Sequence, residues 1–154
     1  MMHYGGIDIP DQRAEYYPIT FTPDENPFYA ALPYNDLDNN GEPKPNIEKY
    51  IPWATDNDNH GLSICKNRWI KISAHRKSAY AQWEDAGPIG SSDINYVFGN
   101  SEPLGSDFTA MAVSPAVYDY LGLDENDTVA WKFVDFSQVP DGPWRDIITT
   151  SMSN

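Results

Sequence analysis

Two acidic turns carry side-chain oxygens at a spacing that could ligate a hard cation. The run Asp36-Leu37-Asp38-Asn39-Asn40-Gly41 reproduces the first half of a calcium-binding loop, in which alternate oxygens precede a glycine. The glutamate expected at the twelfth position is replaced by Ile47, and Glu48 comes one residue late. The second run, Asp56-Asn57-Asp58-Asn59-His60-Gly61, also lacks a closing ligand. We therefore predict turns rich in Asn and Asp, with no metal and no cofactor.

Hydroxyl, imidazole and thiol groups give weaker signals. Residues 16–22, YYPITFT, are expected to form the first strand, so Thr20 and Thr22 would share one face and could meet a substrate. Alternatively, the two threonines simply occupy strand positions, where β-branched residues are common. The three histidines are scattered, so no zinc site or imidazole base is predicted. Cys65 is the only cysteine, and we expect a buried apolar residue rather than a nucleophile.

Composition limits the possible partners. The 154 residues suffice for one domain with its own core. The net charge of −13 disfavours nucleic acid and anionic membrane surfaces but leaves neutral glycans open. No apolar run approaches a membrane span, and the first ten residues lack the apolar core of a signal peptide. Aromatic residues make up 14% of the chain, which is typical of a β-rich core and leaves some for stacking on sugars.

The residues between 79 and 121 set the expected organisation. Residues 79–85 alternate as a strand does and end at a Gly-Pro turn, and residues 108–113 form a second short strand. Ser114 and Pro115 then cap a helix whose apolar face ends before Gly122. Further strands are expected at residues 47–53, 68–73 and 128–136, with a basic hairpin turn at residues 75–77.

This order resembles the double-psi β-barrel family, which includes RlpA-like proteins, expansin barrels, family-45 endoglucanases and MltA-type lytic transglycosylases. Trp83-Glu84-Asp85-Ala86-Gly87-Pro88 is similar to the family's strand that ends in Asp before a Gly-Pro turn. Met111-Ala112-Val113-Ser114-Pro115 is similar to its Asp-Leu-Ser-Pro element. The resemblance implies a mainly β fold, a six-stranded double-psi barrel with short helices and long loops. We expect it at residues 16–154, after an N-terminal arm at residues 1–15.

The resemblance also implies a site that cleaves cell-wall glycans. Asp85 matches the first family Asp, the second maps to Ala112, and Thr20 matches the groove threonine. In the lytic transglycosylases one Asp serves as acid and then as base, and the sugar's own C6 hydroxyl closes an anhydro ring. The expected substrate-binding residues are Thr22, Tyr80, Trp83, Gly87, Ser114 and Trp144.

Ala112 cannot ionise, and three explanations stay open. The alanine could be a deliberate inactivation of a lytic transglycosylase or glycoside hydrolase. It could mark a natural, non-catalytic, expansin-like barrel that binds glycan through Trp83, Tyr80, Tyr96 and Trp144. The acid could instead have shifted to Asp107 or Asp93.

Peptidoglycan is the preferred substrate, with another polysaccharide as the alternative. The turn at Asp85 resembles the lytic transglycosylases and RlpA-like proteins more than the endoglucanases, whose disulfides are missing here. The resemblance implies a monomer that is secreted, periplasmic or held in the cell envelope. A purely structural or inhibitory barrel has no specific support.

Overall fold

The protein is described by a computed structural model that covers residues 8–54, 63–86, 93–99, 111–125 and 127–150. Its described residues form two sheets and a few short helices, so the prediction of a mainly β fold with short helices is confirmed. The strands are β1 (Arg13–Ala14), β2 (Tyr17–Pro18), β3 (Tyr29–Leu32), β4 (Trp69–Ala74), β5 (Lys77–Ala86), β6 (Ala112–Val113) and β7 (Ala130–Val134). The helices are α1 (Ile94–Val97), α2 (Pro115–Leu121) and the 3-10 turns η1 (Ile47–Lys49), η3 (Phe136–Gln138) and η4 (Pro143–Arg145).

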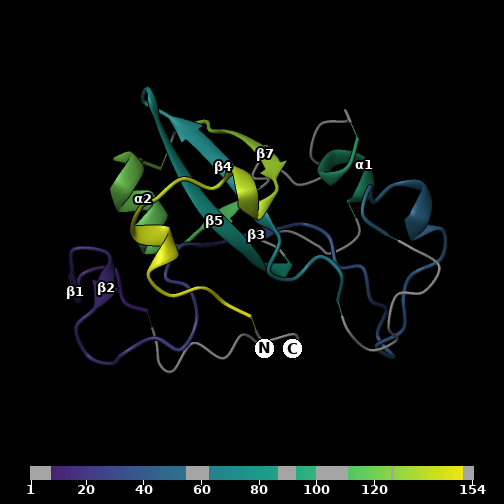
Figure 1. Ribbon diagram of the computed structural model, residues 1–154, viewed down its shortest axis with the longest axis horizontal. Helices are drawn as coiled ribbons and strands as arrows, with labels where there is room; N and C mark the ends of the chain where they lie inside the picture. The colour runs from purple at the N-terminus through teal and green to yellow at the C-terminus, as the bar shows by residue number, and fades with distance from the viewer. Residues whose placement is uncertain (1–7, 55–62, 87–92, 100–110, 126, 151–154) are drawn as a thin grey trace.

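The main sheet has five strands in the order β6-β3-β5-β4-β7 (Figure 1). β4 and β5 are a hairpin whose two-residue turn, His75-Arg76, has φ values of 52° and 63°. Left-handed conformation at both turn positions matches the twist of the paired strands. β3 runs parallel to β5, whereas the other pairs are antiparallel. Within the described residues no pairing joins the edge strands β6 and β7, so a closed barrel is not observed.

The predicted helix at residues 115–121 is confirmed by its capping. The Ser114 hydroxyl accepts a hydrogen bond from the backbone amide of Val117, Pro115 is the first helical residue, and Gly122 has a left-handed φ of 65°. Ala116, Val117 and Leu121 are buried and pack in the larger of two hydrophobic clusters. Figure 1 places α2 beside β5.

The C-terminal segment covers part of the sheet. In Figure 1 part of this yellow segment crosses in front of β5, and η4 contacts β5. Buried amide side chains connect the two: Asn26 donates to the side-chain oxygen of Gln82, and Gln82 donates to the backbone carbonyl of Thr149. The amide of Thr149 donates back to Gln82 at 2.8 Å. These bonds fix the tail across the strands.

Two expected strands are not formed. At residues 16–22 only Tyr17–Pro18 is a strand, and it pairs with β1 rather than with the main sheet. This small sheet crosses the boundary that we placed between residues 15 and 16. Residues 47–53 were also expected to be extended, but Ile47 and Ile51 are both buried, and the amide of Ile51 donates to the carbonyl of Ile47. Burial four residues apart is the spacing of a helical turn, so this prediction is wrong.

Candidate functional site

The two positions that the family resemblance picked out lie in one row across the sheet. Ala31 of β3 pairs with Asp85 of β5 on one side and with Ala112 of β6 on the other. Residues in register on neighbouring strands share a face, and strands lie roughly 4.8 Å apart. The Cα atoms of Asp85 and Ala112 are therefore about 10 Å apart across β3. Asp85 and Ala112 are both exposed, so this face is open to a ligand.

A break in register places Glu84 next to this row. Ala30 pairs with Trp83, but the next residue, Ala31, pairs with Asp85, so Glu84 has no partner on β3. An extra residue in one strand re-aims side chains and is frequent beside functional sites. Here it brings two consecutive carboxyl side chains to the end of β5 in different environments: Asp85 is exposed and Glu84 is only 8% exposed.

A cavity of about 190 Å³ opens at this end of the sheet. β3 and β5 are parallel, so the segment after β3 and the last residues of β5 meet at their carboxyl ends. The third wall comes from the loop that precedes β4. The lining residues are 34–36, Ser63, Cys65, Lys66 and 83–86.

Glu84 is the least satisfied polar side chain of this cavity. Neither of its carboxyl oxygens has a hydrogen-bond partner among the described residues. Burial, and then the nearby charge of Glu25, raise its pKa to about 8, against an opposing effect of Lys66. Glu84 is therefore mainly protonated at neutral pH and can donate a proton.

Tyr34 supplies a second unsatisfied group. Its hydroxyl is buried and has no hydrogen-bond partner in the described part of the chain. Burial is the main reason that the pKa of Tyr34 is raised, so the phenol remains protonated. The lining of the cavity thus contains a buried carboxylic acid and a buried phenol, two groups that can both donate and accept hydrogen bonds.

Asp36, which is buried, also belongs to the cavity lining. Its carboxylate accepts from the Ser63 hydroxyl at 2.5 Å and from the amide of Ile64 at 3.0 Å. The Ser63 hydroxyl also accepts from the amides of Cys65 and Lys66. Asp36 therefore anchors the loop before β4. The other expected turn residue, Asp38, accepts from the amides of Asn40 and Glu42, as an Asx turn does.

Cys65 is buried, as expected. Desolvation and the neighbouring Asp36 raise the pKa of its thiol, so the nucleophilic thiolate is disfavoured. The described residues contain no group of three or more His, Cys, Asp or Glu side chains placed to hold a metal ion.

The tryptophans expected to stack on sugars lie in the core. Trp144 is 3% exposed and packs against Phe28, Tyr80 and Tyr120, with its indole N–H donating to the carbonyl of Pro140. Trp83 is 2% exposed and its indole N–H donates to the carbonyl of Asp85. Trp83 therefore positions the site, and Trp144 stabilises the fold.

The remaining candidates occupy different places. Half-buried Tyr80 packs on Trp144, and the hydroxyl of Tyr96 accepts from the indole of Trp131. Thr20 and Thr22 are exposed and lie outside both sheets, so no strand presents them to the Asp85 row. Asp93 is buried at the start of α1. Gly87 and Asp107 lie outside the described residues.

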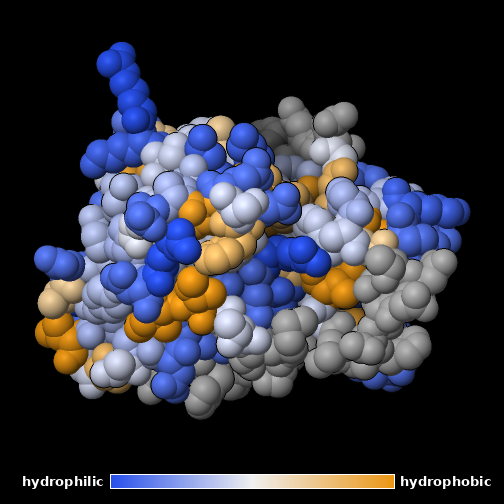
Figure 2. Space-filling model, in the orientation of Figure 1, coloured by the Kyte–Doolittle hydropathy of each residue, from blue (hydrophilic) through white to orange (hydrophobic). Residues whose placement is uncertain are grey.

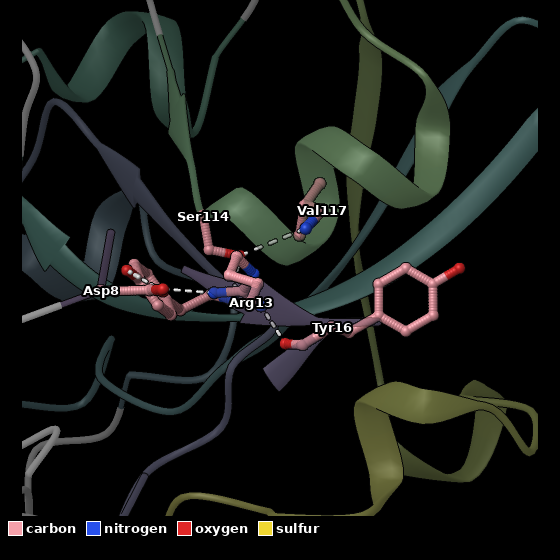
Figure 3. Close-up of polar contacts among 6 residues, drawn as sticks. Asp8, Arg13, Tyr16, Ser114 and Val117 are labelled. Carbon is pink, nitrogen blue, oxygen red and sulfur yellow. Dashed lines mark hydrogen bonds and ion pairs between the residues drawn. The ribbon is translucent and has the colours of Figure 1, made fainter. Parts of the chain in front are cut away.

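Ser114 stabilises the fold and does not lie on the open face of the sheet. It is buried, and its hydroxyl accepts from the amides of Val117 and Tyr29, which joins α2 to β3 (Figure 3). In the same view the guanidinium of Arg13 contacts the carboxylate of Asp8 and the carbonyl of Tyr16. Asp8 also accepts from the Tyr29 hydroxyl at 3.2 Å, so the N-terminal segment is tied to β3.

The sequence did not indicate that four side chains of this cavity belong to one site: Glu84, Tyr34, Asp36 and Lys66. The one available signal was the pair Glu84-Asp85, because two consecutive acidic residues interrupt the alternation of residues 79–85. The partners that bury Glu84 come from distant segments, which no local pattern reveals.

No family model, curated protein or solved structure matches this chain. None of the helices in the described part of the chain has the length and apolar character needed to span a bilayer. On the face drawn in Figure 2, hydrophilic residues predominate and hydrophobic residues form separate small patches.

Proposed function

We propose that this protein acts on a cell-wall glycan, preferably peptidoglycan, as a glycan-cleaving protein of the double-psi β-barrel type. The observation that carries this proposal is the row Asp85–Ala31–Ala112, which lies on an open face beside a cavity with acidic walls. These are the two positions at which the family resemblance expects acidic residues.

The chemistry requires a proton donor for the leaving oxygen and negative charge near the oxocarbenium-like centre that develops as the bond breaks. The exposed carboxylate of Asp85 can supply the charge. Two alanines complete the row, so no bulky side chain of the row obstructs a sugar chain lying across β3 and β6. A lytic transglycosylase would close an anhydro ring with the substrate's own hydroxyl.

The test compares the natural chain with Ala112→Asp and Ala112→Asn on purified peptidoglycan and cellulose. We expect Ala112→Asp to create or increase cleavage, because a second carboxyl would face Asp85 across one strand and general acid catalysis typically contributes ~10²–10⁴-fold. Ala112→Asn has nearly the same shape without the acid, so it should gain nothing. Mass spectrometry should find products that lack one water, as anhydro-muramyl ends do.

A non-catalytic, expansin-like glycan-binding protein is the second candidate. Ala112 favours it, because one expected carboxyl is missing from the row. If all three proteins bind glycan equally and none releases sugar, this candidate is supported. If none of them binds either polysaccharide, both candidates are wrong.

A further inference from the structure

We propose that Glu84 is a catalytic residue of this site, donating a proton to the glycosidic oxygen of a sugar held in the cavity. This inference rests on the proposed function, and it gives Glu84 the role that the family resemblance assigns to position 112. The chain would then cleave glycan without a carboxyl on β6.

The register break makes this placement possible. Consecutive residues of a regular strand point to opposite faces, which would separate Glu84 from the ligand side of Asp85. With Glu84 unpaired between Trp83 and Asp85, both acidic residues line the same cavity. One site therefore holds a buried carboxylic acid and an exposed carboxylate, which are the two groups that glycoside cleavage uses.

The unsatisfied oxygens of Glu84 point to a ligand. Buried polar atoms nearly always have hydrogen-bond partners, and exceptions call for an explanation. Here both carboxyl oxygens of Glu84 and the hydroxyl of Tyr34 are buried without partners among the described residues, and both residues belong to the cavity lining. Hydroxyl and ether oxygens of a sugar would satisfy these atoms once the two side chains turn toward the cavity. The cavity volume of about 190 Å³ leaves room for roughly one sugar ring.

The surroundings of Glu84 keep it protonated. Glu25, which precedes β3, is buried and its charge opposes ionisation of Glu84, while Lys66 favours it. The other titratable groups around the cavity are Tyr34, Asp36, Cys65 and Asp85. Burial is the largest cause of the raised pKa, so the donor state does not depend on one neighbour.

The step balances within the enzyme and its substrate. The carboxyl proton of Glu84 passes to the glycosidic oxygen, which keeps the electron pair of the breaking bond to the anomeric carbon and leaves as a hydroxyl. The substrate's own C6 hydroxyl oxygen then bonds to the anomeric carbon, and its proton returns to Glu84. One glycosidic bond is exchanged for one anhydro bond, with no water or redox partner.

The principal test is Glu84→Gln in the full chain, assayed on purified peptidoglycan by anhydro-product release and by pull-down binding. Glutamine keeps the shape but carries no acidic proton, so we expect cleavage to fall ~10²–10⁴-fold while glycan binding is retained. The matched control is Glu48→Gln, the same change at an exposed glutamate of η1, which should leave both activities unchanged.

The pH dependence of cleavage distinguishes a catalytic role of Glu84 from a purely structural one. Cleavage by the natural protein should decline as pH rises through about 8, where Glu84 loses its proton. Glu25→Gln removes a negative charge and should move this decline to lower pH, whereas Lys66→Met removes a positive charge and should move it to higher pH. The natural protein's profile needs no substitution, so it applies even if Glu84→Gln does not fold.

The outcomes separate the two proposals. If the natural protein neither binds nor cleaves glycan, the proposed function fails together with this inference. If it binds glycan without cleaving it, the proposed cleavage and the role of Glu84 are both wrong, and the glycan-binding candidate is supported. If Glu84→Gln cleaves as well as the natural protein, only the role of Glu84 is wrong. The role of Glu84 is also wrong if neither Glu25→Gln nor Lys66→Met changes the pH at which cleavage declines.

Discussion

The carboxylate of Asp36 and the hydroxyl of Ser63 are joined by a hydrogen bond of 2.5 Å, although 27 residues separate them in sequence. The bond is buried, and Ser63 accepts two backbone amides of its own loop at the same time. The part of the cavity lining around Asp36 thus depends on one serine that connects two loops.

Replacing this serine should loosen the wall and destabilise the protein. Ser63→Ala leaves one Asp36 oxygen and two amides without their partner, and each buried unsatisfied group costs ~1–3 kcal/mol. We expect a loss of free energy of unfolding of at least about 3 kcal/mol in urea titrations. Ser73→Ala is the control, because the half-buried Ser73 hydroxyl bonds only the Ser78 hydroxyl in the described residues. Equal stability of the two variants would contradict the importance of the Asp36–Ser63 bond.

Glu84 should make stability depend on pH in a defined direction. The pKa of Glu84 is raised to about 8 in the folded protein from the ordinary glutamate value of 4.5, which applies to the unfolded chain. The folded state therefore binds the proton more tightly. Between these two values the folded chain keeps a proton that the unfolded chain loses, so this contribution to stability is complete at low pH and declines as pH rises to about 8.

Glu84→Gln removes that dependence. The two proteins should have similar free energies of unfolding near pH 4, because glutamine resembles a protonated glutamic acid. Above pH 8 the variant should be the more stable, by on the order of 5 kcal/mol at most. Urea unfolding of both proteins across this range measures the difference. Stability curves that run parallel would show that Glu84 titrates normally.

The buried amides of Asn26 and Gln82 should hold the C-terminal segment on the sheet. Gln82→Leu removes a donor and an acceptor that serve Asn26, Asn67 and Thr149. We expect a loss of about 2–4 kcal/mol and faster proteolysis of the tail, because several buried groups lose their partner together. Gln12→Leu, at an exposed position, is the control and should change neither measurement.

Ser114 should be worth more than an ordinary helix cap. Loss of a capping serine costs about 1 kcal/mol, and this hydroxyl also accepts from the amide of Tyr29 on β3. Ser114→Ala should therefore lower the free energy of unfolding by about 1–2 kcal/mol. Thermal unfolding compared with Ser137→Ala, at an exposed position in η3, measures it. A matching small effect in both variants would contradict the double role.

Elements set by local chemistry were predictable. The helix after Ser114 followed from a capping serine, a proline and a terminal glycine, all within one short segment. The hairpin at His75-Arg76 followed from two alternating runs around a polar turn. Each depends on neighbours in sequence, so no distant contact was needed to recognise it.

Features that depend on distant packing were not predictable. Residues 47–53 were expected to form a strand, yet Ile47 and Ile51 are buried together in the smaller hydrophobic cluster. An exposed tryptophan and a buried one look alike in sequence, so Trp144 could not be assigned. The raised pKa of Glu84 arises from its burial and then from the charge of Glu25, and both conditions exist only in the folded chain.

The parallel pairing of β3 with β5 also dictates an order of assembly. The β4–β5 hairpin closes a short turn and can form within microseconds, whereas β3 must wait for a long loop to close before it gains its central neighbour. During synthesis, β3 therefore leaves the ribosome well before the strand that completes it. Its segment stays unpaired over that interval, so we expect β3 to be a site of aggregation in the newborn chain.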